Sequence, residues 1–188
     1  MIYLLTNGII MMSIDPMKKE IALVIIDLQK KFVITTLEDR EKSFDHKLEN
    51  VNILSDMFRK AGRPVIFVKF RGEGHDMYKG MDGDDILDSV TVGENDIFVD
   101  KRHMNSFRES DLEKTVRSVG CDAILLCGMV SEYCVTSTYY AAFDHDITPY
   151  FAKDACISTK EYINDALNQI LKTMDIDETE AYLKEHSR

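Results

Sequence analysis

The chain has 188 residues, of which 45% are hydrophobic and 30% charged, and its formal net charge is −10. These proportions are typical of a globular domain and argue against disorder, a collagen helix or a coiled coil. The acidic balance argues against nucleic acid or an anionic membrane surface as a partner, because both attract clusters of Lys and Arg.

The first 20 residues are expected to form an N-terminal extension, poorly ordered or packed in an oligomer, and residues 21–188 a single domain. Residues 1–14 carry no charge and lack the basic start of a signal peptide. They are also shorter than the ~20 apolar residues that cross a bilayer. Met11, Met12 and Met17 are alternative starts.

Strand and helix patterns alternate along the chain. Short apolar runs predict buried strands at 21–26, 65–68, 97–99, 123–127 and 147–151. Helical spacing predicts four helices: one with Leu48 on its apolar face that ends at Gly62, one that begins at the capping-box pattern Ser110-x-x-Glu113, and two at about 132–143 and 160–174. The glycine-rich stretch 72–93 is expected to be a long loop, and an acidic tail follows residue 174. The alternation predicts an α/β three-layer sandwich, a mostly parallel sheet flanked by helices as in Rossmann-like folds.

The four cysteines contain no C-x-x-C pair, so neither a zinc ribbon nor a disulfide framework is expected. Reduced thiols favour a cytoplasmic location. Cys121, Cys127 and Cys156 fit the usual fate of a free cysteine, a small buried apolar side chain.

Three reactive side chains follow predicted strands, and the carboxyl ends of parallel strands meet at one edge of a sheet. Asp27 follows the first strand, Lys101 follows the third, and Cys134 lies just beyond the fourth. If Ser131 caps the next helix, Cys134 falls in its first turn, where a thiolate is favoured. Each residue also has an ordinary interpretation: Asp27 as a helix cap or ion-pair partner, Lys101 as a solvated lysine, Cys134 as a core residue.

Four motifs in this order resemble the isochorismatase-like cysteine hydrolases, which include nicotinamidase, N-carbamoylsarcosine amidohydrolase and ureidoacrylate amidohydrolase. The matching stretches are 22–29, Lys101 with 105–107, 128–131 with Cys134 and Val135, and 154–156. The resemblance spans about residues 21–174 and implies the isochorismatase-like fold.

The resemblance implies a triad of Asp27, Lys101 and Cys134 that hydrolyses the C–N bond of a small amide, carbamoyl or ureido compound. Cys134 attacks the carbonyl carbon and forms a thioester, Asp27 moves the protons, and Lys101 stabilises the thiolate. The resemblance also implies a cis peptide at Val130–Ser131, which would turn the amides of Ser131 and Cys134 toward the oxyanion. No cofactor is implied, and relatives are commonly dimers or tetramers.

The chain departs from nicotinamidases in the segment where they hold a metal. No Asp-x-His occurs there, and Glu73 with His75 is a weak remnant of a ligand pair, so no metal is predicted. True isochorismatases lack the nucleophilic cysteine, so Cys134 favours C–N hydrolysis. Isochorismatase-type hydrolysis of another small metabolite, or small-molecule binding without catalysis, stays open as an alternative.

Several side chains beside the motifs are candidates for contact with substrate. The aromatic candidates for pocket walls are Phe32, Phe70, Phe107 and Tyr133, and the candidates for a carboxylate fork are Arg71 and Arg102. Plain core packing and surface placement are the alternatives for these two groups. Patterns for a receiver domain, an aspartyl phosphatase and a dinucleotide-binding loop are all incomplete in this sequence.

Overall fold

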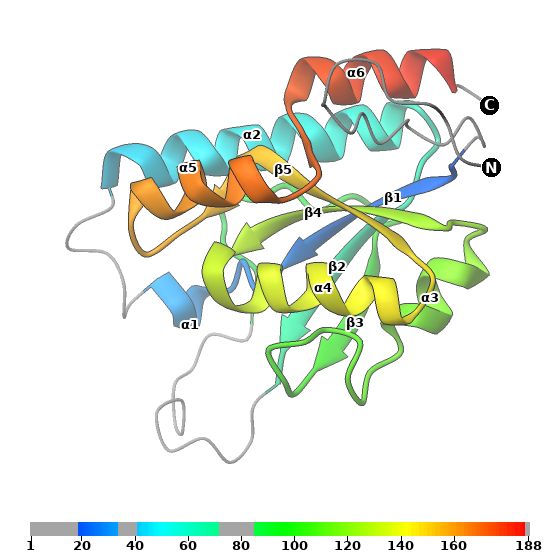
Figure 1. Cartoon of the computed structure of the whole chain (residues 1–188), viewed down its shortest axis with the longest axis horizontal. Coiled ribbons are helices and arrows are strands. Elements are labelled where there is room, and N and C mark those ends of the chain that lie inside the picture. Colours follow the sequence, from blue (N-terminus) through cyan, green and yellow to red (C-terminus); the bar gives the residue numbers. More distant parts are fainter. Residues whose placement is uncertain (1–18, 34–40, 72–84, 187–188) are drawn as a thin grey trace, which may run out of the picture.

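The computed structural model describes residues 19–33, 41–71 and 85–186, and Figure 1 shows their arrangement. Six strands form one sheet in the order β3-β2-β1-β4-β5-β6, and each neighbouring pair is parallel. Their bounds are β1 Ile21–Ile26, β2 Val65–Phe70, β3 Ile97–Lys101, β4 Ala123–Met129, β5 Thr148–Ile157 and β6 Thr173–Met174. The predicted three-layer α/β sandwich is therefore confirmed.

Helices cover both faces of the sheet. α2 (Glu41–Lys60) packs against α6 (Ile176–Glu185) on one face, and α3 (Leu112–Ser118) and α4 (Thr136–Asp144) lie on the other, as Figure 1 shows. α5 (Glu161–Ile170) packs against β5 and the short π-helix η2 (Ser131–Val135), while α1 (Lys30–Val33) is a single turn after β1. No helix in the described ranges is long and apolar enough to cross a membrane.

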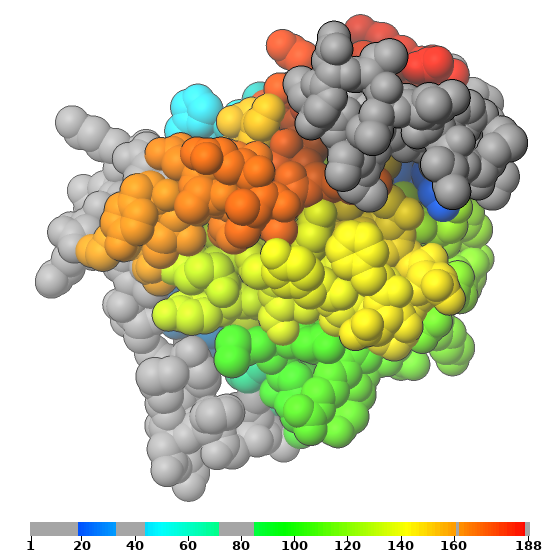
Figure 2. Space-filling model, viewed as in Figure 1, coloured from blue at the N-terminus to red at the C-terminus, as the bar shows by residue number. Residues whose placement is uncertain are grey.

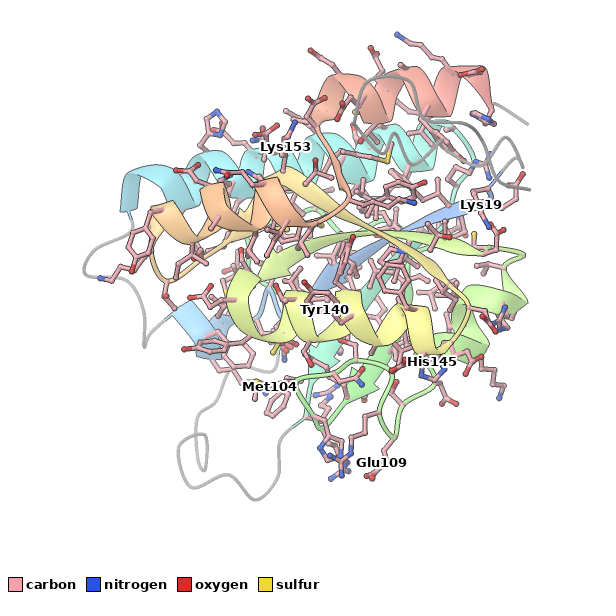
Figure 3. All side chains as sticks on the ribbon, in the orientation of Figure 1. Lys19, Met104, Glu109, Tyr140, His145 and Lys153 are labelled. Atoms are coloured by element: carbon pink, nitrogen blue, oxygen red, sulfur yellow. The ribbon has the colours of Figure 1, made fainter. Side chains whose placement is uncertain are left out.

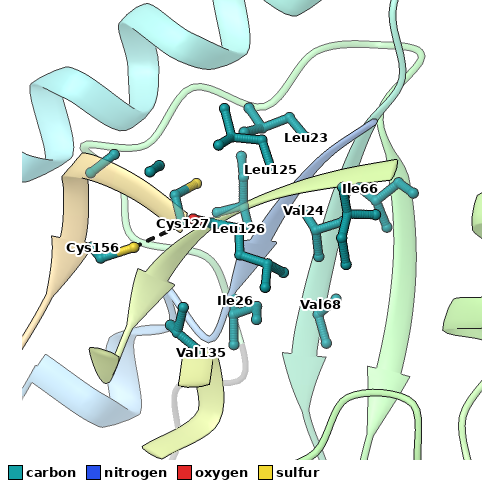
Figure 4. Packing of buried hydrophobic residues seen from close by; sticks show 14 of the residues in the cluster. Leu23, Val24, Ile26, Ile66, Val68, Leu125, Leu126, Cys127, Val135 and Cys156 are labelled. Atoms are coloured by element: carbon teal, nitrogen blue, oxygen red, sulfur yellow. Dashed lines mark hydrogen bonds between the residues drawn. The ribbon is translucent and has the colours of Figure 1, made fainter. Parts of the chain in front are cut away.

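The two central strands explain why the sheet needs covering on both sides. Every residue of β1 and of β4 is buried, as continuous apolar runs in parallel sheets usually are. Figure 4 shows Leu23, Val24 and Leu125 packed among side chains of the neighbouring strands. Cys127 and Cys156 are part of this core, and the Cys156 thiol donates a hydrogen bond to the Leu126 carbonyl at 3.4 Å.

The structure differs from the predicted elements near the C-terminus. The helix expected at 160–174 ends at Ile170, because Leu171 is extended and the next residue, Lys172, accepts the Phe151 amide of β5 with its carbonyl at 2.8 Å. Met174 then lies in β6, and the acidic tail forms α6. A capping box begins α6, with Asp175 and Glu178 exchanging hydrogen bonds of 2.8 and 2.9 Å.

The capping box predicted from Ser110 and Glu113 is wrong. The Ser110 hydroxyl does accept the Leu112 amide at 3.2 Å, but α3 begins after Asp111 and Glu113 does not reach back. Glu113 instead pairs with Arg117 at 3.1 Å and with His145 at 2.8 Å. The pairing of Glu113 with Arg117 is the one expected from their i, i+4 spacing.

The two ends of the described chain are tied together at the amino edge of the sheet (Figure 1). The Tyr182 hydroxyl donates to the Lys19 carbonyl, and Arg63 donates to the His186 carbonyl at 2.7 Å. Arg63 is buried and also forms an ion pair with Glu20, next to the start of β1. α6 is thereby fixed to the segments that lead into β1 and β2.

Gly128 of β4 is expected to be indispensable for the close approach of β4 to β1. Its φ is +108°, and a Cβ built there would collide with the Ile26 backbone oxygen and stand 2.7 Å from the Ile26 nitrogen. Gly128→Ala should therefore lower the free energy of unfolding by more than about 3 kcal/mol, measured by urea denaturation.

The matched control is Gly120→Ala, where φ is +75° but nothing lies within 4 Å of the added Cβ. Its cost should be about 1 kcal/mol, from the backbone conformation alone. Equal losses for the two variants would contradict a steric role for the β4–β1 approach.

Candidate active site

Asp27 lies where the chain leaves the carboxyl end of β1. Its φ is +56°, a left-handed conformation that Asp adopts more readily than most residues. The Asp27 amide donates to the Val68 carbonyl of β2 at 3.0 Å, and its carbonyl accepts the Gln29 amide at 2.8 Å. This sharp turn fixes the backbone, and the carboxylate is buried at the edge of the sheet.

Lys101, the last residue of β3, extends its side chain beneath that carboxylate. Its ammonium lies 2.7 Å from Asp27 Oδ2 and 3.3 Å from the Met104 carbonyl, and the side chain is fully buried. Strand β2 lies between β1 and β3, and its residue Phe70 is in register with Lys101. The Phe70 ring centroid is 5.9 Å from the ammonium, so an aromatic face completes the cation's surroundings.

Cys134 reaches the same place from the other side of β1. It lies in η2, directly after β4, and its thiol lies beside both Asp27 and Lys101, close enough for each of them to act on its pKa. The Thr138 hydroxyl of α4 donates to the Cys134 carbonyl and lies 2.8 Å from the Ser106 hydroxyl, and it accepts the Ser106 amide at 3.0 Å. Thr138 therefore links the cysteine to the segment that follows β3.

Burial governs the charges of these three groups. Burial of Asp27 raises its pKa, and the Lys101 ammonium and the Cys134 thiol oppose that rise. Burial also disfavours the Lys101 ammonium, but Asp27 and Cys134 outweigh it and raise the pKa of Lys101. Burial, with the Asp27 charge, raises the pKa of Cys134 to about 12. The Cys134 thiol is therefore protonated at neutral pH, and the Asp27–Lys101 pair lies beside it.

A pocket of about 690 Å³ opens over Asp27 and Cys134. One part of its wall comes from β4, η2 and α4, and another from the segment after β3, which lies beside α4 on the face shown in Figure 2. The other described residues that line it are Phe32, Phe70, Arg102, His103, Met104, Asn105, Arg108, Met129, Val130, Tyr133 and Ser137. Lys101 lies beneath this surface and supports Asp27 from below.

Comparison with known proteins identifies the family of the chain. The family model described as "Isochorismatase domain" matches residues 21–177, most of the chain. The chain belongs to the isochorismatase family.

Individual relatives of this isochorismatase-family protein show different degrees of likeness. It is 30% identical to the uncharacterised isochorismatase family protein YddQ of Bacillus subtilis, over 87% of this chain and 98% of YddQ. It is 26% identical to Nicotinamidase 3 of Arabidopsis thaliana, over 81% of this chain and 80% of that protein. The crystal structure of N-carbamoylsarcosine amidase from Thermoplasma acidophilum shares the fold, with a TM-score of 0.68 at 20% identity, over 83% of this chain and 95% of that one.

The structure brings most of the predicted site residues of this family member together. Asp27, Lys101 and Cys134 are in mutual contact, and Phe32, Phe70, Arg102 and Tyr133 line the same pocket. Arg71 and Phe107 are not among the lining residues. Arg71 pairs with Asp100 at 3.0 Å, and Phe107 is a core residue stacked on His145 with ring centroids 4.7 Å apart.

The predicted position of the cis peptide is wrong by one residue. The cis bond joins Met129 and Val130, not Val130 and Ser131. β4 is longer than predicted and pairs with β5 as far as Met129, so the chain leaves the sheet at the Met129–Val130 bond. Val130 is the extended residue before η2, and Ser131 is the first residue of η2 rather than its cap. The Ser131 hydroxyl is buried and has no hydrogen-bond partner among the described residues.

Glu73 and His75, the weak remnant of a metal-ligand pair, lie outside the described residues. The described part of the chain contains no cluster of metal-ligating side chains.

The pocket also has lining residues that were not among the predicted ones. Most of them are in the segment after Lys101, namely His103, Met104, Asn105 and Arg108. Their position directly after a strand end was the signal that could have found them.

The Thr138 hydroxyl is expected to be important for the geometry of the site. In Thr138→Val, the buried Ser106 amide loses its acceptor, and the free energy of unfolding should fall by about 1–3 kcal/mol in urea denaturation. Thr91→Val is a matched control, because Thr91 is exposed and its hydrogen bonds with Arg59 and Asn52 are through its backbone; it should cost less than about 0.5 kcal/mol. Equal stabilities of the two variants would show that the link does not stabilise the fold.

Proposed function

We propose that this isochorismatase-family hydrolase is an amidase that uses Cys134 to cleave the C–N bond of a small amide, carbamoyl or ureido compound. The observation that carries the proposal is the contact of the thiol with both members of the Asp27–Lys101 pair at the floor of a pocket. A nucleophile and its base lie within hydrogen-bond reach, which nucleophilic catalysis requires.

The proton of the thiol has to leave during the attack. With a pKa of about 12, the Cys134 thiolate at pH 7 lies ~7 kcal/mol above the thiol in free energy, so almost no Cys134 is present as the nucleophilic thiolate before the attack. The Asp27 carboxylate contacts that thiol, and burial has raised its pKa, so it is a stronger base than an exposed aspartate. Asp27 therefore takes the proton as sulfur bonds to the carbonyl carbon.

The same proton then serves the leaving group. When the tetrahedral intermediate collapses, protonated Asp27 gives its proton to the nitrogen, the C–N bond breaks, and the acyl group remains on Cys134 as a thioester. Water, deprotonated by Asp27, attacks that thioester and releases the acid and the thiol. Lys101 keeps its charge throughout and stabilises whichever neighbour is anionic, and the amides of Ser131 and Cys134 are the proposed donors to the oxyanion.

Two other functions would use the same pocket. An isochorismatase-type hydrolase would act on another small metabolite, and a binding protein would hold its ligand without chemistry. The contact of Cys134 with a base favours the amidase over both, because neither alternative uses a thiol. We further propose a cytoplasmic homo-oligomer, dimer or tetramer, without a cofactor, on the basis of the free cysteines and the family resemblance.

Cys134→Ala is expected to reduce ammonia release from a panel of small amides and carbamoyl compounds by at least 10⁴-fold, since the nucleophile is gone. Cys121→Ala is the matched control: Cys121 is buried away from the pocket and should be dispensable for turnover. Equal turnover by wild type and Cys134→Ala would reject the cysteine mechanism.

Asp27→Asn is expected to make the Cys134 thiol more acidic and yet to abolish turnover. Removing the carboxylate charge takes away one cause of the raised pKa of Cys134 and leaves the Lys101 ammonium to favour the thiolate, so the thiol pKa should fall. Turnover should nevertheless be lost, because the base is missing. The readout is thiolate absorbance near 240 nm against pH, with Cys134→Ala subtracted. A thiol pKa that stays at or above the wild-type value would remove Asp27 from the site.

A further inference from the structure

The backbone ladder between β1 and β2 ends before β2 does. The Val68 carbonyl of β2 accepts the Asp27 amide at 3.0 Å, and Phe70 lies two residues further along the same strand. Because alternate residues of a strand face the same neighbour, the Phe70 amide and carbonyl also point toward β1. The chain has left that side after the turn at Asp27, and the Leu28 carbonyl accepts the Leu87 amide at 3.0 Å instead.

The side chain of Gln29 replaces the missing backbone partner. Its Oε1 accepts the Phe70 amide at 2.7 Å, and its Nε2 donates to the Phe70 carbonyl at 3.3 Å. Gln29 is fully buried, so both hydrogen bonds are made away from water. A side-chain amide carries the same acceptor and donor as a peptide group, so Gln29 extends the ladder by one more step.

Phe70 is in turn the residue against which two buried ammoniums lie. Lys31 Nζ donates to the Phe70 carbonyl at 2.5 Å and is 5.6 Å from the Phe70 ring centroid. Lys101 Nζ is 5.9 Å from the same centroid, and Lys101 is the Cα partner of Phe70 in β3. The exposed fractions of Lys31 and Lys101 are 4% and 0%, so protein groups surround both side chains.

Both ammoniums act on Asp27. Burial raises the pKa of Asp27, and three neighbouring groups oppose that rise: Lys101 of β3, Cys134 of η2 and Lys31 of α1. Lys101 is the nearest of the two cations, at 2.7 Å from the carboxylate. Asp27 accepts a proton from the thiol only in its ionised form, so its role as a base depends on where the two cations lie.

The contacts close a ring from Asp27 through Gln29, Phe70 and Lys101 back to Asp27. We infer that Gln29 is a positioning residue of the active site: by holding both backbone groups of Phe70, it fixes the two ammoniums that act on Asp27. The effect of Gln29 on turnover rests on the proposed function, whereas its effect on the Asp27 carboxyl does not.

The direct test titrates the Asp27 carboxyl by 13C NMR of the full chain labelled at aspartate, with its resonance identified by its absence from Asp27→Asn. Gln29→Met keeps the size of the side chain but loses both hydrogen bonds to Phe70. The midpoint of the Asp27 titration should rise by at least ~0.5 pH unit, because the cations lose their fixed support while burial still favours the neutral acid. A midpoint that is unchanged or lower would overturn the inference.

Asn50→Leu is the matched control. Asn50 is also a buried side-chain amide that binds a strand carbonyl, that of Asp154 in β5 at 2.9 Å. Figure 3 shows Lys153, next to Asp154 in sequence, beside α2, whereas Met104 of the pocket lies below α4. The Asp27 midpoint should therefore be unchanged in Asn50→Leu. An equal rise in this variant would contradict a specific role of Gln29, because the loss of any buried hydrogen bond would then move the titration.

Gln29→Asn is the second variant, for use if Gln29→Met does not fold. Its amide is one methylene shorter and cannot reach both backbone groups of Phe70, but the position stays polar. The Asp27 midpoint should rise here as well. A folded Gln29→Asn protein with the wild-type midpoint would count against the inference as directly as the same result in Gln29→Met.

Turnover separates this inference from the proposed function. In the panel of small amides, the acid limb of kcat/KM for Gln29→Met should move to higher pH together with the NMR midpoint. A raised midpoint, together with no hydrolysis by wild type, would keep the positioning role of Gln29 and overturn the amidase. Hydrolysis by wild type, together with an unchanged midpoint in Gln29→Met, would keep the amidase and overturn the positioning role.

Discussion

A buried ammonium requires a carboxylate in contact with it, and the pairing of Lys101 with Asp27 at 2.7 Å is the interaction around which the site is organised. Taking two ions out of water costs several kcal/mol for each, and their mutual attraction offsets part of that cost. The pair also bridges three strands: Lys101 is the last residue of β3, Asp27 follows β1, and β2 lies between them. The distance between the Asp27 and Lys101 charges therefore depends on the spacing of β1, β2 and β3.

The strand order explains why the carboxylate is the central member of the three reactive groups. β1 has β2 and β4 as its neighbours, so Asp27 receives the ammonium from one side and the thiol of Cys134 from the other. A carboxylate in this position is suited to passing a proton, because burial raises its pKa while the cation and the thiol oppose that rise. The parallel topology is what delivers all three to one edge.

The sequence was sufficient for the parts of the structure that depend on simple rules. Continuous apolar runs such as Ile21–Ile26 identify buried strands, and the shared edge of a parallel sheet then predicts that Asp27, Lys101 and Cys134 meet. It was insufficient where a local pattern has several partners to choose from. Glu113 has the spacing of a capping box but finds Arg117 and His145, and Phe107 lies next to the site in sequence but turns into the core.

The protonation state of the Cys134 thiol is a further property that the sequence alone does not determine. Its place near a helix start favours a thiolate by ~0.3–1 kcal/mol. Burial and the Asp27 charge raise its pKa from 9.0 to about 12, which corresponds to ~4 kcal/mol in the opposite direction. The larger effect decides, and it depends on how deeply η2 packs behind the pocket, which residue types and spacing do not specify.

The hydrogen bonds from Tyr182 to Lys19 and from Arg63 to His186 have a practical consequence for handling the protein. They hold both described termini at the amino edge of the sheet, whereas the pocket lies at the carboxyl edge. A tether attached at residue 19 or residue 186 leaves the domain at the edge of the sheet opposite the pocket. A short peptide joining residue 186 to residue 19 would suit circular permutation, with the new ends placed far from the reactive groups.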